Sequence, residues 1–322
     1  MLSVISFGEA IVDLISERQN FDLKNVEVFR RLPGGAPANV AVGIARLGGK
    51  VSFLGKFGAD SMGAFLLETL QIEGVDVSHC IRDEASKTML AMVLLKDGGE
   101  REFEFYGEPG AHNALRWDEV PPVLFKKKSI LHFGSLTLIE NSMRSVTLKA
   151  LAVARENQFL ISFDPNIRLS LWKNKETARQ MILEILPMVD ILKLSAEELD
   201  FLLGRQSMDD MGTFLLQQGL QALFVTDGIK GSKVFYGAEY SEVPAFRVHV
   251  VDTTGAGDGF TAGILRGISH WGSLEPLANP HCRELLLQLA NRVASLAITS
   301  RGAMASLPRA NLIPEIAQLD DI

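Results

Sequence analysis

Asp252-Thr253-Thr254-Gly255-Ala256-Gly257-Asp258-Gly259-Phe260 is the stretch that constrains the fold and the chemistry of this chain most strongly. An apolar, strand-like run over 246–251 precedes it, and apolar residues with helical spacing follow it over 260–268. The small residues of the turn leave successive backbone N–H groups uncovered at the start of a helix, which suits an anion. Asp258 lies in the same turn and could act as a base toward an incoming hydroxyl. The stretch therefore predicts phosphoryl transfer to an alcohol.

The composition bounds the class of protein. The chain has 322 residues, enough for one large α/β domain with a small appendage or for two domains, and 47% of them are apolar and 22% charged. The net charge of −7 argues against a general nucleic-acid binder and is compatible with a cytoplasmic enzyme. No apolar run approaches the roughly 18 residues of a membrane span, and Glu9 and Asp13 interrupt any signal-peptide core. Cys80 and Cys282 lack metal-ligand spacing and are interpreted as buried free thiols in a reducing compartment.

Short apolar runs alternate with amphipathic stretches along the chain, as they do in βαβ units. We expect a first strand within residues 1–8 and further strands over 51–57, 130–133, 159–163, 191–194, 222–226 and 233–236. We expect helices over 37–47, 62–73, 141–156, 175–186, 196–203, 208–218 and 283–298. This alternation predicts an α/β fold in which helices cover both faces of a mostly parallel sheet.

Two regions interrupt the alternation. Residues 15–32 mix polar and apolar positions, and residues 87–106 read as two strands around the turn Lys96-Asp97-Gly98-Gly99-Glu100. Together they predict a small sheet that projects from the main domain. We interpret this sheet as a lid over an active site, since phosphoryl transfer must exclude water, and the alternative is an ordinary edge hairpin.

Polar residues follow the expected strands and helices at several other points. Gly8-Glu9 and Asp13 come at the end of the first strand, where an open α/β sheet places ligand contacts, although for Asp13 a loop carboxylate or a helix cap would look the same. In the run 33–41, Gly34 and Gly35 permit close backbone approach to a ligand, and Asn39 can both donate to and accept from a sugar hydroxyl. The alternative for these glycines is a tight turn before a helix.

Four further segments carry weaker signals. Arg168 follows the strand over 159–163 and could bind phosphate or a substrate oxygen, although most single arginines are surface groups. Glu198 could hold Mg²⁺ through water, or it could be a first-turn glutamate that interacts with the helix dipole. The turn over 226–232 could approach a nucleotide, but hairpin turns use the same residues. The segment 297–306 reads as an irregular loop after a long helix.

Several other chemistries lack their sequence signals. The P-loop pattern Gly-x-x-x-x-Gly-Lys-Ser/Thr is missing, and so is the dinucleotide fingerprint Gly-x-Gly-x-x-Gly after the first strand. The six histidines are scattered without metal-ligand spacing, and no Gly-x-Ser-x-Gly elbow supports a nucleophilic serine. These gaps disfavour a P-loop enzyme and a dehydrogenase.

In their order along the chain, from Ser6 to Pro308, these segments resemble the ribokinase-like, PfkB-type carbohydrate kinases. Two signatures carry the resemblance, Gly34-Gly35-Ala36-Pro37-Ala38-Asn39-Val40-Ala41 and Asp252-Thr253-Thr254-Gly255-Ala256-Gly257-Asp258. Within the family, residues 33–49, 99–103 and 164–172 look most like fructokinases. The resemblance implies one ribokinase-like three-layer kinase domain over 1–322, with lid strands from about 15–32 and 87–106. It implies an ATP-dependent kinase that phosphorylates a sugar hydroxymethyl group, fructose first, in the cytoplasm.

The resemblance also implies roles for individual residues. Asp258 would be the base, and the N–H groups of Gly255, Ala256, Gly257 and Asp258 would stabilise the transferred phosphoryl group. The sugar would contact Asp13, Gly34, Gly35, Asn39, Phe105 and Arg168. The nucleotide would lie along Asn166, Lys193, Thr226, Gly228, Gly231 and Asn291, with Mg²⁺ held near Glu198. An activating K⁺ would be held by Asp252, Thr254, Ala297, Ser300, Gly302 and Ser306. The expected partners are the sugar and ATP, without nucleic acid or membrane, and a homodimer through the lid strands is a further expectation.

The chain departs from the family patterns at three places. Ser195 stands where many members have asparagine, and 107–112 differs from the usual fructokinase sequence after the lid strand. Phe105 and Gly107 stand where the 2-keto-3-deoxygluconate kinases use tyrosine and arginine on a substrate carboxylate, which disfavours an acidic substrate. The alternatives are a kinase for 2-keto-3-deoxygluconate, ribose or aminoimidazole riboside, and, more remotely, a non-catalytic sugar-binding regulator.

Overall fold

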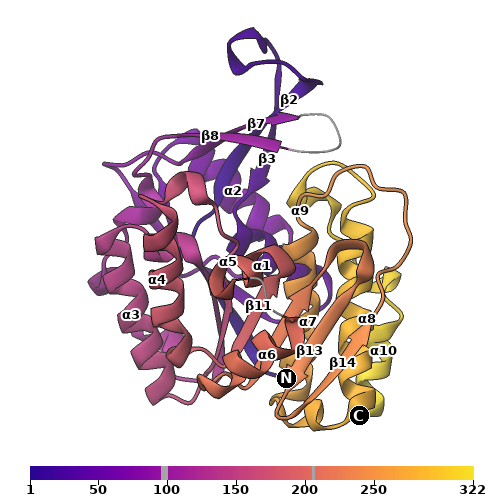
Figure 1. Cartoon of the computed structure of the whole chain (residues 1–322). Helices are drawn as coiled ribbons and strands as arrows, with labels where there is room; N and C mark the ends of the chain where they lie inside the picture. The colour runs from indigo at the N-terminus through magenta and orange to yellow at the C-terminus, as the bar shows by residue number, and fades with distance from the viewer. Residues whose placement is uncertain (96–100, 205–206) are drawn as a thin grey trace.

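A mostly parallel sheet forms the middle layer of the computed structural model, which describes residues 1–95, 101–204 and 207–322 (Figure 1). Among these residues the sheet has eight strands in the order β14-β13-β12-β11-β10-β9-β1-β4. The six strands β4, β1, β9, β10, β11 and β12 run parallel to one another. Beyond β12, β13 and β14 are added in antiparallel pairing at the edge of the sheet. The strands are β1 (Ser3–Phe7), β4 (Val51–Leu54), β9 (Ser129–Gly134), β10 (Leu160–Asp164), β11 (Ile191–Ser195), β12 (Ala222–Thr226), β13 (Ser232–Tyr236) and β14 (Glu239–Val243).

Helices cover both faces of this sheet because its central strands are apolar on both sides. One face packs against α3 (Asn141–Glu156), α4 (Lys175–Ile185), α5 (Ala196–Leu203) and α6 (Met208–Gln217), in a core where the rings of Phe133 and Phe163 stack at 4.6 Å. The other face packs against α1 (Ala36–Arg46), α2 (Ser61–Ile72), α7 (Ala256–Trp271) and α8 (Pro280–Ala297). The short α9 (Ala303–Ser306) and α10 (Glu315–Gln318) follow α8. The predicted three-layer arrangement is confirmed.

Helix α7 is almost entirely buried, because small residues let its neighbours approach closely. A Cβ atom on Gly263 would lie 2.7 Å from the Cα of Ala290 in α8, and one on Gly267 would lie 2.3 Å from Leu286 Cδ1. On another side, a Cβ atom at Gly43 of α1 would lie 2.5 Å from the Cβ of Ala262. Helix α7 therefore has a fixed position between α1 and α8.

A separate small sheet lies beside the main one and projects at the top of Figure 1. Its order is β3-β2-β7-β8, with β2 (Ile11–Gln19), β3 (Phe29–Gly34), β7 (Leu90–Leu95) and β8 (Arg101–Tyr106). The predicted hairpin over 87–106 is confirmed as the antiparallel pair β7–β8, while its turn at 96–100 lies outside the described residues. Apolar residues such as Ile15, Met89 and Val93 hold the small sheet together over Leu136 of the main domain.

Four details of the expected fold are wrong. Residues 246–251 form no strand, because β14 already completes the sheet edge and the N–H of Val251 donates instead to the carbonyl of Ile298. The expected strand over 51–57 divides at Gly55 into β4 and β5 (Lys56–Gly58), which pairs with β6 (Ile81–Asp83) in another sheet. The segment 297–306 contains α9 rather than only loop, and α8 begins three residues before the expected start, at Pro280 after the Asn279 cap.

Both cysteines are free; Cys282 is buried and Cys80 is only partly buried. Among the residues that the structure describes, none of the helices has the length and apolar character that crossing a membrane requires.

Candidate active site

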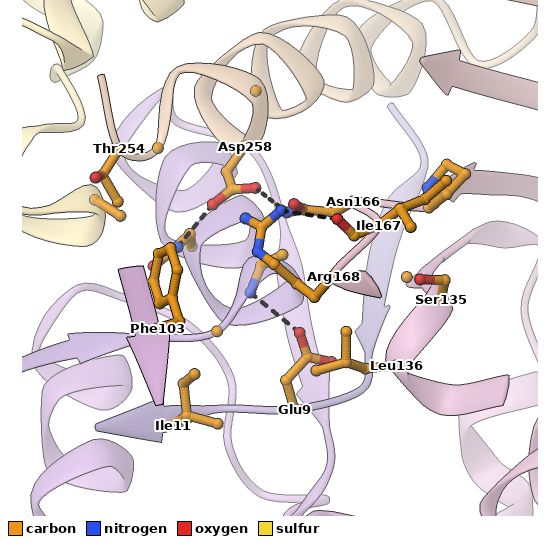
Figure 2. Close-up of a pocket in the computed structure, with 18 of the residues that line it drawn as sticks. Glu9, Ile11, Phe103, Ser135, Leu136, Asn166, Ile167, Arg168, Thr254 and Asp258 are labelled. Atoms are coloured by element: carbon orange, nitrogen blue, oxygen red, sulfur yellow. Dashed lines mark hydrogen bonds between the residues drawn. The ribbon is translucent and has the colours of Figure 1, made fainter. Parts of the chain in front are cut away.

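A cavity of about 540 Å³ opens at the carboxyl ends of β1, β9, β10 and β11, where the small sheet faces the N-terminus of α7 (Figure 2). This is the edge of an open α/β sheet at which ligands bind. The residues predicted from the sequence that line it are Asp13, Gly35, Asn39, Phe105, Asn166, Arg168, Lys193, Glu198, Thr254, Gly255, Gly257 and Asp258. Segments more than two hundred residues apart thus meet around one cavity.

The anion-binding turn stands at the N-terminus of α7. Gly255 caps the helix in a left-handed conformation with φ 80°, and a Cβ atom there would lie 2.8 Å from the Cα of Ala303. The first turn of a helix leaves backbone N–H groups without intrahelical acceptors, and the helix dipole adds positive potential. At Gly257 a Cβ atom would lie 3.0 Å from the Nζ atom of Lys193, so an ammonium group adjoins the turn. The turn therefore offers N–H donors and a cation to an anion.

Asp258 lies at the bottom of the cavity with 7% of its surface exposed. Its Oδ2 accepts a hydrogen bond from Asn39 Nδ2 at 2.7 Å, and its Oδ1 accepts one from Asn166 Nδ2 at 3.1 Å. Burial raises the pKa of Asp258 to about 6; the bond from Asn39 opposes this, and the charge of Asp164 adds to it. Two amides thus hold the carboxyl in place, and it changes charge close to neutral pH, as a general base requires.

Lys193 and Asp164 form a buried ion pair behind the turn. The Nζ atom of Lys193 is 3.2 Å from Asp164 Oδ2, which also accepts a hydrogen bond from Thr261 Oγ1 at 2.8 Å. Burial lowers the pKa of Lys193, but the carboxylates of Asp164, Glu198 and Asp258 outweigh it and leave that pKa above its usual value. Lys193 therefore stays charged beside the anion-binding turn.

The other end of the cavity combines polar groups with the apolar rings of Phe103 and Phe105 from β8 of the small sheet. Gly35 enters α1 with φ 99°, and a Cβ atom there would lie 2.6 Å from the carbonyl oxygen of Glu9. Asp13 lies within β2 of the small sheet and not at the end of the first strand as expected; its carboxylate adjoins Gly34. Figure 2 shows Phe103 of β8 opposite Arg168, whose guanidinium carbon is 5.8 Å from that ring.

The carboxylate of Glu198 has the geometry of a helix cap. Its Oε2 accepts from the N–H of Ser195 at 2.9 Å, and its Oε1 accepts from the N–H of Ile167 at 2.8 Å. Ser195 Oγ in turn accepts from the N–H of Glu198, which completes a capping box at the start of α5. Among the described residues, no three histidine, cysteine or acidic side chains cluster as a metal site. The role of Glu198 toward Mg²⁺ stays a prediction, and only a metal ion held chiefly by phosphates and water fits this arrangement.

Asp252 connects the turn with the segment after α8. Its Oδ1 accepts from the N–H of Thr254 at 2.9 Å, and its Oδ2 accepts from the N–H of Gly302 at 2.8 Å. Among the residues that the structure describes, the buried hydroxyl oxygen of Thr254 has no hydrogen-bond partner. Ser306 donates to the carbonyl of Ala303 at the same place. These groups suit a monovalent cation; Ala297 and Ser300 belong to the same segment, at the end of α8 and just after it.

Four residues predicted to contact a nucleotide do not line this cavity. Thr226, Gly228 and Gly231 lie at the β12–β13 connection, where Gly231 is required because a Cβ atom would lie 2.1 Å from the carbonyl oxygen of Val243. The buried amide of Asn291 accepts from Ser232 Oγ and donates to the carbonyls of residues 243 and 244. Its side chain therefore holds the sheet edge together, while the nucleotide roles of all four stay predictions.

Sequence reasoning assigned no role to several residues of the cavity wall, namely Glu9, Ile11, Phe103, Ser135, Leu136, Ile167, Glu197 and Thr253. The sequence does single out Gly8-Glu9 together with Asp13 at the end of the first strand, where an open α/β sheet places ligand contacts. Ser135 and Leu136 follow β9 in the same way.

Comparisons with known proteins agree with this geometry. A family model described as pfkB family carbohydrate kinase matches residues 1–310. Fructokinase-1 of Zea mays is 39% identical over 308 residues, which cover 95% of this chain and 94% of the maize protein. The crystal structure of a fructokinase from Xylella fastidiosa with bound ATP superposes with a TM-score of 0.89 at 32% identity over 99% of each chain. A fructokinase double mutant from Vibrio cholerae O395, with fructose, ADP and potassium ion bound, gives a TM-score of 0.87 at 35% identity over 97% of each chain.

Proposed function

The chain belongs to the pfkB family of carbohydrate kinases, and we propose that it transfers the γ-phosphoryl group of ATP to a hydroxymethyl group of fructose. One observation carries the proposal: a buried carboxyl, Asp258, lies in the first turn of the helix whose N-terminus can bind an anion. Phosphoryl transfer to an alcohol needs a base and an anion-binding site this close together. The fructokinase relatives at about 40% identity and the fructose-bound structural neighbour support fructose as the acceptor.

In the proposed reaction, Asp258 takes the proton from the hydroxyl as the oxygen attacks the γ-phosphorus. Asn39 and Asn166 hold the carboxylate toward the acceptor, so that little reorganisation is needed. The N–H groups of residues 255–258 and the ammonium of Lys193 neutralise charge that develops on the phosphoryl oxygens. Mg²⁺ bound with ATP would add positive charge at the phosphates, with Glu198 the residue that would hold it through water.

The acceptor end of the cavity suits a neutral polyol. Asp13, Gly35, Asn39 and Arg168 offer polar groups to hydroxyls on one side, and Phe103 and Phe105 of β8 offer an apolar cover on the other. The cover belongs to the small sheet, which supports the interpretation of that sheet as a lid. Pairing of lid strands between two copies of the chain stays a prediction.

A monovalent cation, K⁺, would bind beside the anion-binding turn. Asp252 holds that turn to Gly302, and the buried hydroxyl of Thr254 offers a further oxygen. A cation bound there would add positive potential behind the anion-binding turn without displacing the turn. The potassium ion bound in the Vibrio cholerae fructokinase structure supports this part of the proposal.

A panel of acceptors tests the function. Fructose, ribose, 2-keto-3-deoxygluconate and aminoimidazole riboside are compared by coupled ADP detection, with and without K⁺. We expect the highest kcat/KM for fructose and lower activity when Na⁺ replaces K⁺. A higher kcat/KM for another acceptor would reassign the substrate, whereas ADP release from none of them would favour a non-catalytic sugar-binding protein. Activity that is indifferent to K⁺ would contradict the cation site only.

The pH dependence of kcat/KM should report the pKa of the proposed base, Asp258. Only the ionised carboxylate accepts a proton, and burial raises the pKa of Asp258 to about 6, so kcat/KM for fructose is expected to fall as the pH drops below about 6. The measurement is kcat/KM from about pH 5 to 8, with melting curves at each pH to separate loss of activity from unfolding. An acid limb near the ordinary aspartate value of about 4 would argue against Asp258 as the titrating base.

A further inference from the structure

Four buried side-chain atoms in the cavity wall have no hydrogen-bond partner among the described residues. They are Glu9 Oε2, Asn39 Oδ1, Ser135 Oγ and Thr254 Oγ1. Buried polar atoms in folded proteins nearly always have a partner, so a group of them around one cavity indicates a ligand that supplies the missing hydrogen bonds. Glu9 is the acidic residue among the four, and its Oε2 has no role in the fold or in the reaction described above.

The position of Glu9 is fixed by its neighbours. It follows β1 directly, its side chain is 3% exposed, and its Oε1 accepts from the N–H of Ala36 at 3.3 Å. Its own carbonyl oxygen lies under Gly35, where a Cβ atom would come within 2.6 Å of it. Figure 2 shows the carboxyl group between Leu136 and the entry to α1, on the side of the cavity away from Thr254. Glu9 is therefore held at the acceptor end of the cavity, with its Oε2 buried in the cavity wall.

The charge on Glu9 depends on the groups around it. Burial raises the pKa of Glu9 to about 7; the hydrogen bond from Ala36 and the charge of Arg168 oppose this rise, and the charge of Asp258 adds to it. In its ionised form this carboxyl group accepts a hydrogen bond from a hydroxyl at Oε2, which the NH2 group of a glutamine cannot do. A carboxylate ligand at this point would meet Glu9, Asp13 and Asp258 together, so the neighbourhood favours a neutral ligand.

We propose that Glu9 is a further acceptor-binding residue, whose Oε2 forms a hydrogen bond with a sugar hydroxyl other than the one that is phosphorylated. The proposal rests on the function proposed above and adds a determinant of specificity to it. Its alternative is that Glu9 only braces the Gly35–Ala36 turn through Oε1. The two roles can be separated because glutamine keeps an oxygen for the N–H of Ala36 and changes the group at Oε2.

The test is Glu9→Gln, with Glu17→Gln as the matched control. Glu17 is an exposed glutamate of β2 that does not line the cavity. For Glu9→Gln we expect KM for fructose to rise about tenfold or more, with kcat and KM for ATP within about threefold of the parent values, as for loss of a ground-state contact. Fructose binding measured by calorimetry without nucleotide should weaken by the same factor. Glu17→Gln should match the parent in every measurement.

Deoxyfructose analogues, each lacking one hydroxyl that is not phosphorylated, identify the contact. With the parent enzyme, the analogue that lacks the hydroxyl bound by Glu9 should have a lower kcat/KM than fructose. With Glu9→Gln, the same analogue and fructose should have similar kcat/KM values, since both changes remove the same hydrogen bond. An unchanged KM for fructose in Glu9→Gln, or equal losses for every analogue in both proteins, would overturn the proposal. If Glu9→Gln does not fold, Glu9→Asp keeps the charge but shortens the reach and should raise KM in the same way; an unchanged KM there would also overturn it. A parent enzyme that phosphorylates no sugar would refute the proposed function instead.

Discussion

Replacing Asp258 by asparagine is expected to lower kcat by about three to four orders of magnitude, near the upper end of what a general base contributes. The asparagine keeps the size of the side chain, but it can accept only one of the two hydrogen bonds that Asn39 and Asn166 donate, and it cannot take a proton at neutral pH. KM for both substrates should change little, because the rest of the cavity is intact. Steady-state kinetics with coupled ADP detection measures the effect.

The stability of this variant has its own expected sign. In the folded protein the pKa of Asp258 is raised to about 6 from its ordinary value of 3.8, so ionising it at neutral pH costs about 3 kcal/mol. Below about pH 4 the carboxyl of Asp258 is protonated in both the folded and the unfolded state, and the cost is absent. As the pH rises from about 4 to 6, the free energy of unfolding falls by this amount. Asp258→Asn should therefore melt at the same temperature or higher at pH 7.

Asp210→Asn is the control for this experiment. Asp210 is also the third residue of a helix, α6, but it is exposed and is not among the residues that line the cavity. It should keep its kcat, which separates loss of a base from loss of a charge at a helix N-terminus. Turnover near the parent rate in Asp258→Asn would refute the assignment of the base.

The second large effect is expected for Gly255→Ala, which should lower kcat/KM by about 100-fold or more. The reason is that the substitution would move the backbone N–H groups of the turn away from the positions in which they bind the phosphoryl group. Gly255 has φ 80°, where an alanine is strained by about 1–2 kcal/mol. Its new Cβ atom would also lie 2.8 Å from the Cα of Ala303, so the turn and α9 must move apart. Kinetics and urea unfolding together measure the two consequences.

Helix α7 supplies a matched control at its other end. Gly272 has φ 81°, but a Cβ atom there would meet no described residue within 4 Å. Gly272→Ala should lose about 1 kcal/mol of stability through backbone strain and keep its kcat/KM. Equal losses of activity in both variants would mean that the geometry of the turn is not what matters.

The sequence predicted the parts of the site that depend on local backbone chemistry. The turn over 252–258 and the glycines before Asn39 could be identified because small residues at a helix start have few other uses. That the two segments meet, with Asn39 donating to Asp258, follows from the positions of β1 and α7 and could only be inferred through the family resemblance.

The rest depended on long-range packing. Residues 246–251 look like a strand, but whether such a run joins a sheet depends on a free edge, and β14 occupies it. The sequence places Glu9 at the end of the first strand, but it does not show that Gly35 closes over it. Asn291 carries no sign in the sequence that its amide holds residues 243 and 244 to α8. In each case the deciding neighbour lies beyond the local stretch of sequence.

The glycine contacts that fix α7 between α1 and α8 divide the molecule into a part that tolerates change and a part that does not. The base and the anion donors belong to α7, where a Cβ atom at Gly263 would lie 2.7 Å from the backbone of α8 and one at Gly267 would displace Leu286. Phe103 and Phe105 belong to a hairpin that packs on the main domain largely through Leu136. Sequence differences among such kinases are therefore expected to be most frequent in the hairpin. Substitutions in these two strands would change which acceptor binds, while the residues of α7 that act on the phosphoryl group stay the same.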